Sequence, residues 1–188
     1  LWSTSWVLIK RTLDDVPSLT FAGLRYTIAF LILLPMLWKH KAEVRALSLN
    51  EWGQLATLGV VFYTLTQGGQ FVTLNHLEAV SFSLILNFTT LIVAVFGIIF
   101  LREIPSRLQW GGIAVFILGV LIYFAPALTQ PSTPQAEGRW LGFALAGATV
   151  FTNAVSGVLG RKINRSGTIS PLVVTVISMG IGATLLLG

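Results

Sequence analysis

Residues 79–101 read AVSFSLILNFTTLIVAVFGIIFL, and this stretch contains no charged side chain. A helix needs about 20 consecutive, mainly apolar residues to cross the hydrocarbon core of a bilayer. The few polar residues in the stretch are Ser, Asn and Thr, which are uncharged. The stretch therefore predicts a membrane-spanning helix, and the rest of the chain can be compared with it.

The composition of the whole chain supports the same interpretation. Of 188 residues, 54% are hydrophobic and 10% are charged, and the mean hydropathy is +0.81. An ordinary soluble domain carries about 25% charged residues, whereas a surface that faces lipid needs none. The chain contains no cysteine, which excludes disulfides and thiolate metal sites, and we expect neither a metal nor a cofactor.

Other apolar runs extend the pattern along the chain. Runs of sufficient length predict spans at 18–38, 52–73, 108–124, 140–160 and 169–188. A shorter run at 1–9 precedes Lys10 and reads as the end of a first helix, so we expect residues upstream of Leu1 and downstream of Gly188. The expected fold class is all-α, a polytopic transmembrane helix bundle, with seven spans in this chain. Residues 125–138 are rich in Pro and polar residues and predict an extramembrane linker.

The placement of Lys and Arg predicts the orientation in the membrane, because cytoplasmic loops carry an excess of basic residues. Eight basic residues fall on one side, against three on the other. The eight are Lys39, Lys41, Arg45, Arg102, Arg107, Arg161, Lys162 and Arg165, and the three are Lys10, Arg11 and Arg139. We therefore expect a cytoplasmic N-terminus. The basic residues form short clusters between apolar runs rather than a continuous stripe, so nucleic acid is not an expected partner.

Weak internal similarity suggests a repeat. Residues 6–11 and 157–162 each read as an apolar helix end followed by two basic residues, and Pro17 or Pro171 then opens another span. The first and second helices would thus correspond to the sixth and seventh. A period of five spans is odd, so the second copy would enter the membrane from the opposite face. Inverted repeats of this kind are common in secondary transporters, although any two apolar helices with basic ends look alike.

Four segments resemble the EamA-like branch of the drug/metabolite transporter superfamily. They are FAGLRYTIAF at 21–30, AVSFSLIL at 79–86, FGIIFLREIPS at 96–106, and QWGG at 109–112 with Gly119-Val120. The resemblance covers essentially the whole chain and implies two five-helix repeats, of which this chain would hold about seven helices in ten. The expected organisation is a first repeat at 1–124, the linker, and two helices of the second repeat at 139–188. Many members carry a proline midway along the fourth helix, where this chain reads Asn87-Phe88-Thr89-Thr90, so a proline bend is not implied.

Polar side chains within the spans should point away from lipid. They fall at helical spacing on three helices, which places each set on one face. The sets are Thr64, Gln67 and Gln70; Ser83, Asn87 and Thr90; and Thr149, Asn153 and Ser156. We expect a substrate pathway lined by Gln67, Gln70, Ser83, Asn87, Thr90, Asn153 and Ser156. The same side chains also join helices to one another, and the sequence leaves both explanations open.

Three charged residues are candidates for gating or structural roles. Arg25 lies within the second span, where it contacts either a substrate anion, a partner in the bundle or the interface by snorkelling. Glu103 follows the fourth span, and the family resemblance favours a structural or gating role for it. Lys10 is either a cation near the first helix or an interface anchor. Every acidic residue lies outside or at the edge of a span, so carboxylate-based proton coupling is not supported.

These features predict a transporter and not an enzyme. The expected function is secondary transport of a small polar metabolite, such as an amino acid, across a prokaryotic cell membrane, in the direction of export as the resemblance suggests. The expected partners are that small-molecule substrate and the lipid bilayer, and the assembly is either a monomer or a homodimer. A non-transporting scaffold or receptor is the alternative. An intramembrane enzyme fits less well, because Ser156-Gly157 has no intramembrane histidine near it in sequence.

Overall fold

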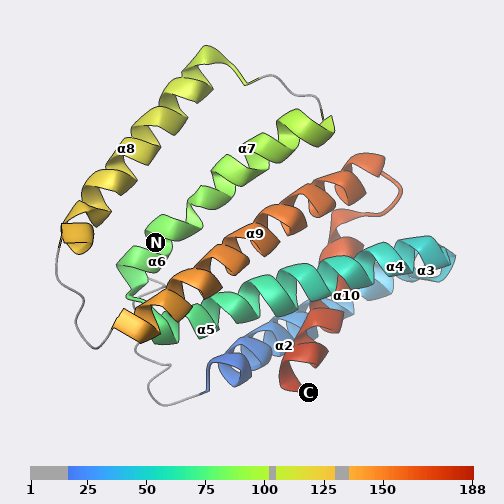
Figure 1. Ribbon diagram of the computed structural model, residues 1–188. Coiled ribbons are helices and arrows are strands. Elements are labelled where there is room, and N and C mark those ends of the chain that lie inside the picture. The colour runs from blue at the N-terminus through green and yellow to red at the C-terminus, as the bar shows by residue number, and fades with distance from the viewer. Residues whose placement is uncertain (1–16, 102–104, 130–135) are drawn as a thin grey trace.

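The computed structural model describes residues 17–101, 105–129 and 136–188 (Figure 1). Its helices are α2 (Ser18–Leu37), η1 (Trp38–His40), α3 (Lys41–Ala46), α4 (Leu49–Leu58), η2 (Gly59–Gly68), α5 (Gly69–His76), α6 (Ala79–Leu86), α7 (Phe88–Leu101), α8 (Arg107–Thr129), α9 (Ala136–Ser166) and α10 (Pro171–Leu187). These described parts of the chain contain no strand.

The predicted fold class is confirmed, since the chain forms a helical bundle with spans of membrane length. The helices Ser18–Ala46, Ala79–Ile99 and Trp140–Ser166 are long and apolar enough to cross a bilayer. Two shorter apolar helices, Arg107–Tyr123 and Pro171–Leu187, match the predicted spans at 108–124 and 169–188. The predicted span at 52–73 lies inside α4, η2 and α5, which follow one another without a break. The first predicted helix lies outside the described residues.

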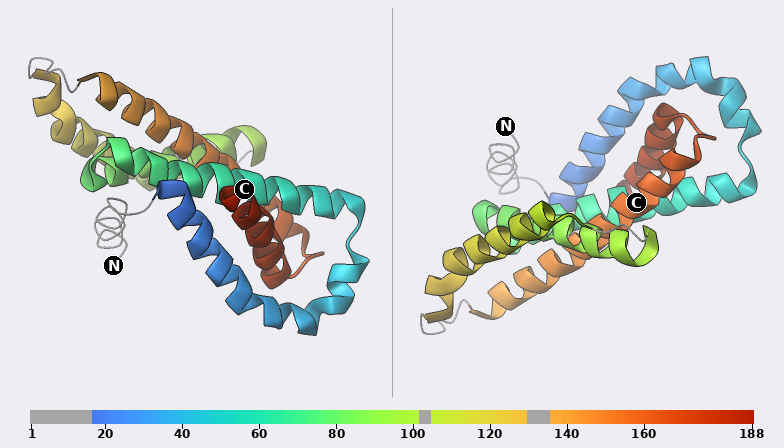
Figure 2. Two further views of the ribbon diagram at one scale, coloured as in Figure 1. Left: turned by 90° about the horizontal axis from the view of Figure 1, so that it is seen from below. Right: turned by 90° about the horizontal axis from the view of Figure 1, so that it is seen from above.

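Helix α10 occupies the middle of one half of the bundle, between α2 and the long α4–η2–α5 helix (Figure 2). It runs antiparallel to α2, because Leu187 near its end lies against Gly23 and Ser170 before its start contacts Glu43. A Cβ at Gly23 would lie 2.6 Å from Leu187 Cδ2, so this glycine allows the close approach. The buried cluster around α10 consists of Leu55, Leu58, Ile163, Ile169, Val173, Val174 and Ile177.

The middle of the long helix has π geometry from Gly59 to Gly68. The Thr66 hydroxyl donates to the Val61 carbonyl oxygen at 2.8 Å, five residues back, which suits the wider turn. The Thr64 hydroxyl donates to the Gly182 carbonyl oxygen of α10 at 3.3 Å. Gly59 also faces α10, since a Cβ there would lie 2.6 Å from the Ser178 carbonyl oxygen. π segments are often found at functional sites, and this one contains the predicted pathway residue Gln67.

The fourth predicted span is interrupted at Asn87, between α6 and α7, without a proline. The Asn87 backbone N–H donates to Leu84, three residues back, at 3.2 Å instead of to Ser83. The Asn87 side-chain amide donates to the freed Ser83 carbonyl oxygen at 2.8 Å. The Asn87 side chain thus replaces the missing backbone donor, so the helix is interrupted without leaving the Ser83 carbonyl oxygen unpaired.

Helix α9 extends past the predicted span of 140–160 to Ser166, because charged residues such as Arg161 and Lys162 continue a helix readily. It ends at Gly167, which adopts a positive φ of 65°. The Gly167 N–H donates to the Asn164 carbonyl oxygen at 3.3 Å, as is typical of a glycine that follows a helix. Helix also covers both ends of the predicted linker, since α8 continues to Thr129 and α9 begins at Ala136.

Candidate functional site

The larger cavity in the described residues has a volume of about 1270 Å³ and lies among the long helix, α9 and α10. Its lining combines aromatic, hydroxyl, amide and basic side chains from these three elements. The lining residues are Leu58, Phe62, Tyr63, Asn153, Ser156, Gly157, Val158, Gly160, Arg161, Lys162, Asn164, Arg165, Ser166, Val174, Thr175 and Ser178. A mostly preformed concave site with a few polar groups is the usual form of a small-molecule site.

One face of α9 supplies most of the polar wall. Asn153, Ser156, Gly160 and Asn164 are spaced three or four residues apart, so they lie on one side of the helix. The Ser156 hydroxyl donates to the Asn153 carbonyl oxygen at 2.8 Å. The Asn153 side-chain amide donates to the Thr89 hydroxyl of α7 at 3.2 Å. Asn153 therefore joins two helices and also lines the cavity, and its role in a pathway stays a prediction.

The facing walls come from Tyr63 and Ser178. Tyr63 packs edge-on against the rings of Tyr26, at 5.2 Å between centroids, and Phe62, at 4.9 Å. The Ser178 hydroxyl donates to the Val174 carbonyl oxygen at 2.6 Å within α10. Neither residue was among the predicted pathway residues. Helical spacing could have indicated both residues, because Tyr63 lies four residues before Gln67 and Ser178 lies three residues after Thr175.

A second cavity of about 660 Å³ lies on the other side of the contact between α7 and α9. Its lining includes Asn87 and Thr90 from α7 and Gln109 from α8. Arg161 of α9 lines both cavities. The polar stripes of the two helices, expected to share one interior, thus face two neighbouring cavities that meet at Arg161.

The remaining predicted pathway residues lie apart from both cavities. Gln67 is partly buried in η2, and Gln70 in α5 is 4% exposed. Ser83 lies one turn before Asn87 and contributes its carbonyl oxygen to the break in the helix. Their role in a pathway stays a prediction.

Of the three charged candidates, only Arg25 lies in the described residues. Its side chain is exposed on the bundle, and its guanidinium carbon lies 5.6 Å from the centre of the Tyr26 ring. A guanidinium at this distance from an aromatic face makes a cation–π contact. Lys10 and Glu103 lie outside the described residues, so their proposed roles stay predictions.

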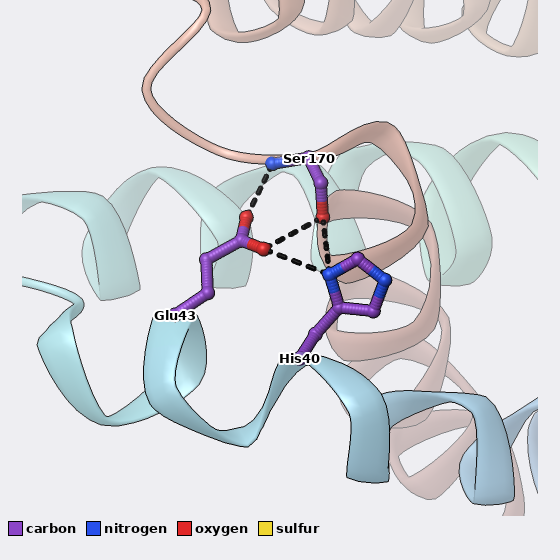
Figure 3. A network of polar contacts seen from close by, with 3 residues as sticks. All are labelled: His40, Glu43 and Ser170. Atoms are coloured by element: carbon purple, nitrogen blue, oxygen red, sulfur yellow. Dashed lines mark hydrogen bonds and ion pairs between the residues drawn. The ribbon is translucent and has the colours of Figure 1, made fainter.

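At the end of the bundle where α9 stops, three polar residues join the first and last described parts of the chain (Figure 3). The Glu43 carboxylate accepts hydrogen bonds from the backbone N–H and, at 3.0 Å, the hydroxyl of Ser170. His40 Nδ1 lies 3.0 Å from the same carboxylate and 3.5 Å from the Ser170 hydroxyl. The donation by the Ser170 backbone N–H is the main cause that lowers the pKa of Glu43, which lies beyond the apolar part of its helix.

A second carboxylate reinforces this end. Glu51 forms a capping box with Ser48 at the start of α4, with its carboxylate 2.8 Å from both the Ser48 backbone nitrogen and hydroxyl. These hydrogen bonds lower the pKa of Glu51, and the Thr168 hydroxyl adds a smaller contribution. The link between α9 and α10 is thus held by Glu43 through Ser170, while Glu51 caps the start of α4.

The Ser–His–Glu set is not arranged as a nucleophilic triad. In a triad, one imidazole nitrogen accepts the nucleophile's proton and the other nitrogen bonds the carboxylate. Here both the hydroxyl and the carboxylate lie against the same nitrogen of His40, and the hydroxyl also contacts the carboxylate directly (Figure 3). The arrangement suits a structural contact between two segments.

Comparison with known proteins identifies relatives of the chain. The EamA-like transporter family matches residues 1–125. An uncharacterized transporter, YvbV, of Bacillus subtilis is 30% identical over 66% of this chain and 40% of its own length. An S-adenosylmethionine/S-adenosylhomocysteine transporter of Chlamydia trachomatis is 26% identical over 88% of this chain and 50% of its own length.

A similarity over a shorter stretch reaches a eukaryotic protein. A UDP-galactose translocator of Mus musculus is 29% identical over 55% of this chain and 27% of its own length. The chain thus spans half the length of these three relatives or less. No solved structure matches the chain significantly. The family match covers well over half of the chain, so this multi-pass helical membrane protein belongs to the EamA-like transporter family.

Proposed function

We propose that the full-length protein is a secondary transporter that moves a small polar metabolite by alternating access. The observation that carries this proposal is the cavity of about 1270 Å³ among the long helix, α9 and α10. An interior cavity with amide and hydroxyl groups is costly in a membrane bundle unless a polar solute or water occupies it. Relatives that carry transporter names agree with this class of function.

The packing of α2 against α10 supports an inverted repeat. These are the helices expected to correspond, and an inverted repeat requires such a pair to run in opposite directions. They lie antiparallel, with Gly23 against Leu187 at one end and Gly180 against the Phe30 ring further along. In this scheme, rocking of the two repeats would open the cavity to one side and then to the other.

The contact between Glu43 and Ser170 supports a closed state at the basic end of the bundle. It joins the loop after the second span to the start of the seventh, and these belong to different repeats in the proposed organisation. We assign this end to the cytoplasm, because Lys39, Lys41 and Arg45 lie beside Glu43 in sequence and Arg161 and Arg165 line the neighbouring cavity. The N-terminus would then also be cytoplasmic, in a prokaryotic cell membrane.

The substrate class expected from a mostly neutral polar lining is an amino acid or a metabolite of similar size, moved outward. The names of relatives refer to S-adenosylmethionine and UDP-galactose, which are also small polar metabolites. The alternative of a scaffold or receptor would leave the cavity without a purpose. Enzyme activity has no support at Ser156, whose hydroxyl donates to a backbone carbonyl of its own helix.

The test is uptake by the purified full-length protein in liposomes, with a panel of radiolabelled amino acids and similar metabolites. We expect at least one solute to accumulate above protein-free liposomes. Asn153→Leu should then lower the uptake about tenfold or more, because it removes the amide from the cavity wall. Phe151→Leu is the matched control, since Phe151 lies on the same helix, is 53% exposed and lines neither cavity. Absence of uptake for the whole panel, or normal uptake by Asn153→Leu, would count against the proposal.

A further inference from the structure

We propose that the larger cavity selects small organic anions, with a carboxylate or phosphate group held by Arg161 and attracted by Lys162 and Arg165. This inference rests on the proposed transport function and names its substrate class. Its basis is that three basic side chains line this one cavity, while no acidic side chain does.

The charge at the cavity is not balanced by nearby carboxylates in the described residues. Glu43 is bound to Ser170 and His40, and Glu51 is bound to Ser48. Both carboxylates are therefore engaged elsewhere, and neither lines the cavity. A cleft lined by one sign of charge and walled by low-dielectric protein concentrates ions of the opposite sign.

The cavity offers a path from the basic residues to the polar wall. Arg161 lies eight residues after Asn153 on α9, which corresponds to about 12 Å along the helix axis, and both residues line the cavity. A solute of about this length would place an anionic end at Arg161 and a polar end at Asn153. An arginine suits this position, because its planar guanidinium binds carboxylate and phosphate oxygens in pairs.

The glycines between these two residues leave the path open. A Cβ added at Gly157 would have no neighbour closer than Val93 Cγ2 at 3.9 Å, and one at Gly160 none closer than Leu58 Cδ1 at 4.0 Å. These are ordinary contact distances, so helix packing does not require glycine at either position. At Gly182, in contrast, an added Cβ would overlap the Tyr63 side chain. Gly157 and Gly160 are therefore better explained by the space that they leave in the cavity.

Orientation in the membrane is the ordinary explanation for basic residues at helix ends. That explanation does not distinguish Arg161 and Arg165 from Lys41 and Arg107, which belong to the same predicted cytoplasmic side but do not line this cavity. A direct measurement of the cavity's potential can separate the two explanations, and Lys41 supplies the matched control.

The test uses the reactivity of one introduced thiol, because the chain has no cysteine of its own. Gly157→Cys, in the full-length protein freed of any other cysteine and reconstituted in phosphatidylcholine, is treated with two thiosulfonate reagents. One reagent carries a sulfonate and the other a trimethylammonium group. The rate at which each reagent modifies the protein is divided by the rate at which it reacts with a small free thiol in solution. Phosphatidylcholine contributes no anionic lipid that would compete for the cavity.

We expect the anionic reagent to react about tenfold faster than the cationic one after this correction. Arg161→Gln with Arg165→Gln should bring the ratio close to one, whereas Lys41→Gln should leave it unchanged. A ratio of one or below in the Gly157→Cys protein, or a ratio that survives the double substitution, would overturn the inference.

Uptake measurements in the same liposomes test anion selection by the cavity separately from the proposed transport function. The probes are matched pairs, glutamate with glutamine and glycerol 3-phosphate with glycerol. Faster uptake of the anionic member, lost in the double variant, supports the inference, and the two pairs separate carboxylate from phosphate. Uptake of only the neutral members, or a thiol that prefers the cationic reagent, refutes anion selection while leaving transport intact. If the thiol prefers the anionic reagent but the protein takes up no solute, the inference that the cavity prefers anions stands and the proposed transport function is refuted.

Discussion

The carboxylate of Glu43 in α3, beyond the first described span, accepts a hydrogen bond from the backbone N–H of Ser170, at the start of the last span. The two residues are 127 positions apart, and His40 and the Ser170 hydroxyl complete the contact. It fastens α3 to the start of α10 at the basic end of the bundle, where Arg161 and Arg165 line the larger cavity.

Replacement of Glu43 by Gln should weaken this end of the bundle. The substitution keeps the size and one acceptor oxygen but removes the charge that strengthens both hydrogen bonds from Ser170. We expect a loss of about 1 kcal/mol, which corresponds to a thermal midpoint about 2–4 °C lower in detergent. Glu78→Gln is the control, since Glu78 is an exposed glutamate before α6 that does not contact Ser170. Equal midpoints for Glu43→Gln and the native protein would argue against the contact.

Acid should release the same contact. The folded pKa of Glu43 lies below its ordinary value of 4.5, so its contribution to stability is complete above pH 4.5. It is lost as the pH falls through the lowered folded pKa. The thermal midpoints to compare are those of two proteins, one with and one without Glu43→Gln. Their difference should stay constant from pH 7 to pH 5 and disappear below pH 4.5.

Both proteins in this comparison should carry His40→Gln as well. That substitution removes the one other ionisable side chain seen in contact with Glu43 in the described residues, so the titration of the carboxyl group is observed without that of the imidazole. A difference in thermal midpoint that persists at the lowest pH would show that the charge of Glu43 is not its source.

The break in the fourth span should depend on the side chain of Asn87. Asn87→Ala removes the donor that satisfies the Ser83 carbonyl oxygen, and we expect a cost of about 1 kcal/mol, the usual net contribution of such a hydrogen bond. Hydrogen exchange of the amides after residue 87 should become faster. Thr90→Ala, one turn further on the same face, leaves this bond in place and should have a smaller effect. Equal exchange in the two variants would assign the break to tertiary packing instead.

Two glycines should differ sharply in their tolerance of alanine. Gly182→Ala places a methyl group into the Tyr63 side chain and against the Gly59 carbonyl oxygen, where overpacking costs about 1–3 kcal/mol. Gly160→Ala places it in ordinary contact with Leu58 and should gain slightly through helix propensity. Thermal midpoints of the two variants should move in opposite directions. Equal destabilisation by both would show that α10 does not pack as closely on η2 as described.

The spans were predictable because each depends on a local property, the length of an apolar run. The runs at 18–38 and 169–188 correspond to α2 with η1 and to α10. Apolar length carries no information about hydrogen-bond pattern within a helix, so the π segment from Gly59 to Gly68 could not be predicted. The break at Asn87 was also not predicted, because proline is the familiar signal and a side-chain amide here replaces it.

The sequence predicted only part of the candidate site. Helical spacing correctly grouped Asn153 with Ser156 on one face, which lines the larger cavity. Spacing cannot tell which cavity a face meets, and Asn87 meets the smaller one. Arg161 was interpreted only as one of the basic residues that orient the protein in the membrane. Nothing in its local sequence shows that it lies between two cavities. The contact between Glu43 and Ser170 depends on chain segments far apart, and no local pattern predicts it.

The claim that the face of α9 bearing Asn153 borders a water-filled substrate path can be measured directly. Single thiols at Asn153→Cys and Phe151→Cys in the reconstituted full-length protein would be treated with a membrane-impermeant maleimide from each side in turn. Labelling of Asn153→Cys, protected by a transported solute, with little labelling of Phe151→Cys, is the result expected here. Labelling of Phe151→Cys with an inert Asn153→Cys would contradict the account, because the polar face would then lie against lipid or packed protein.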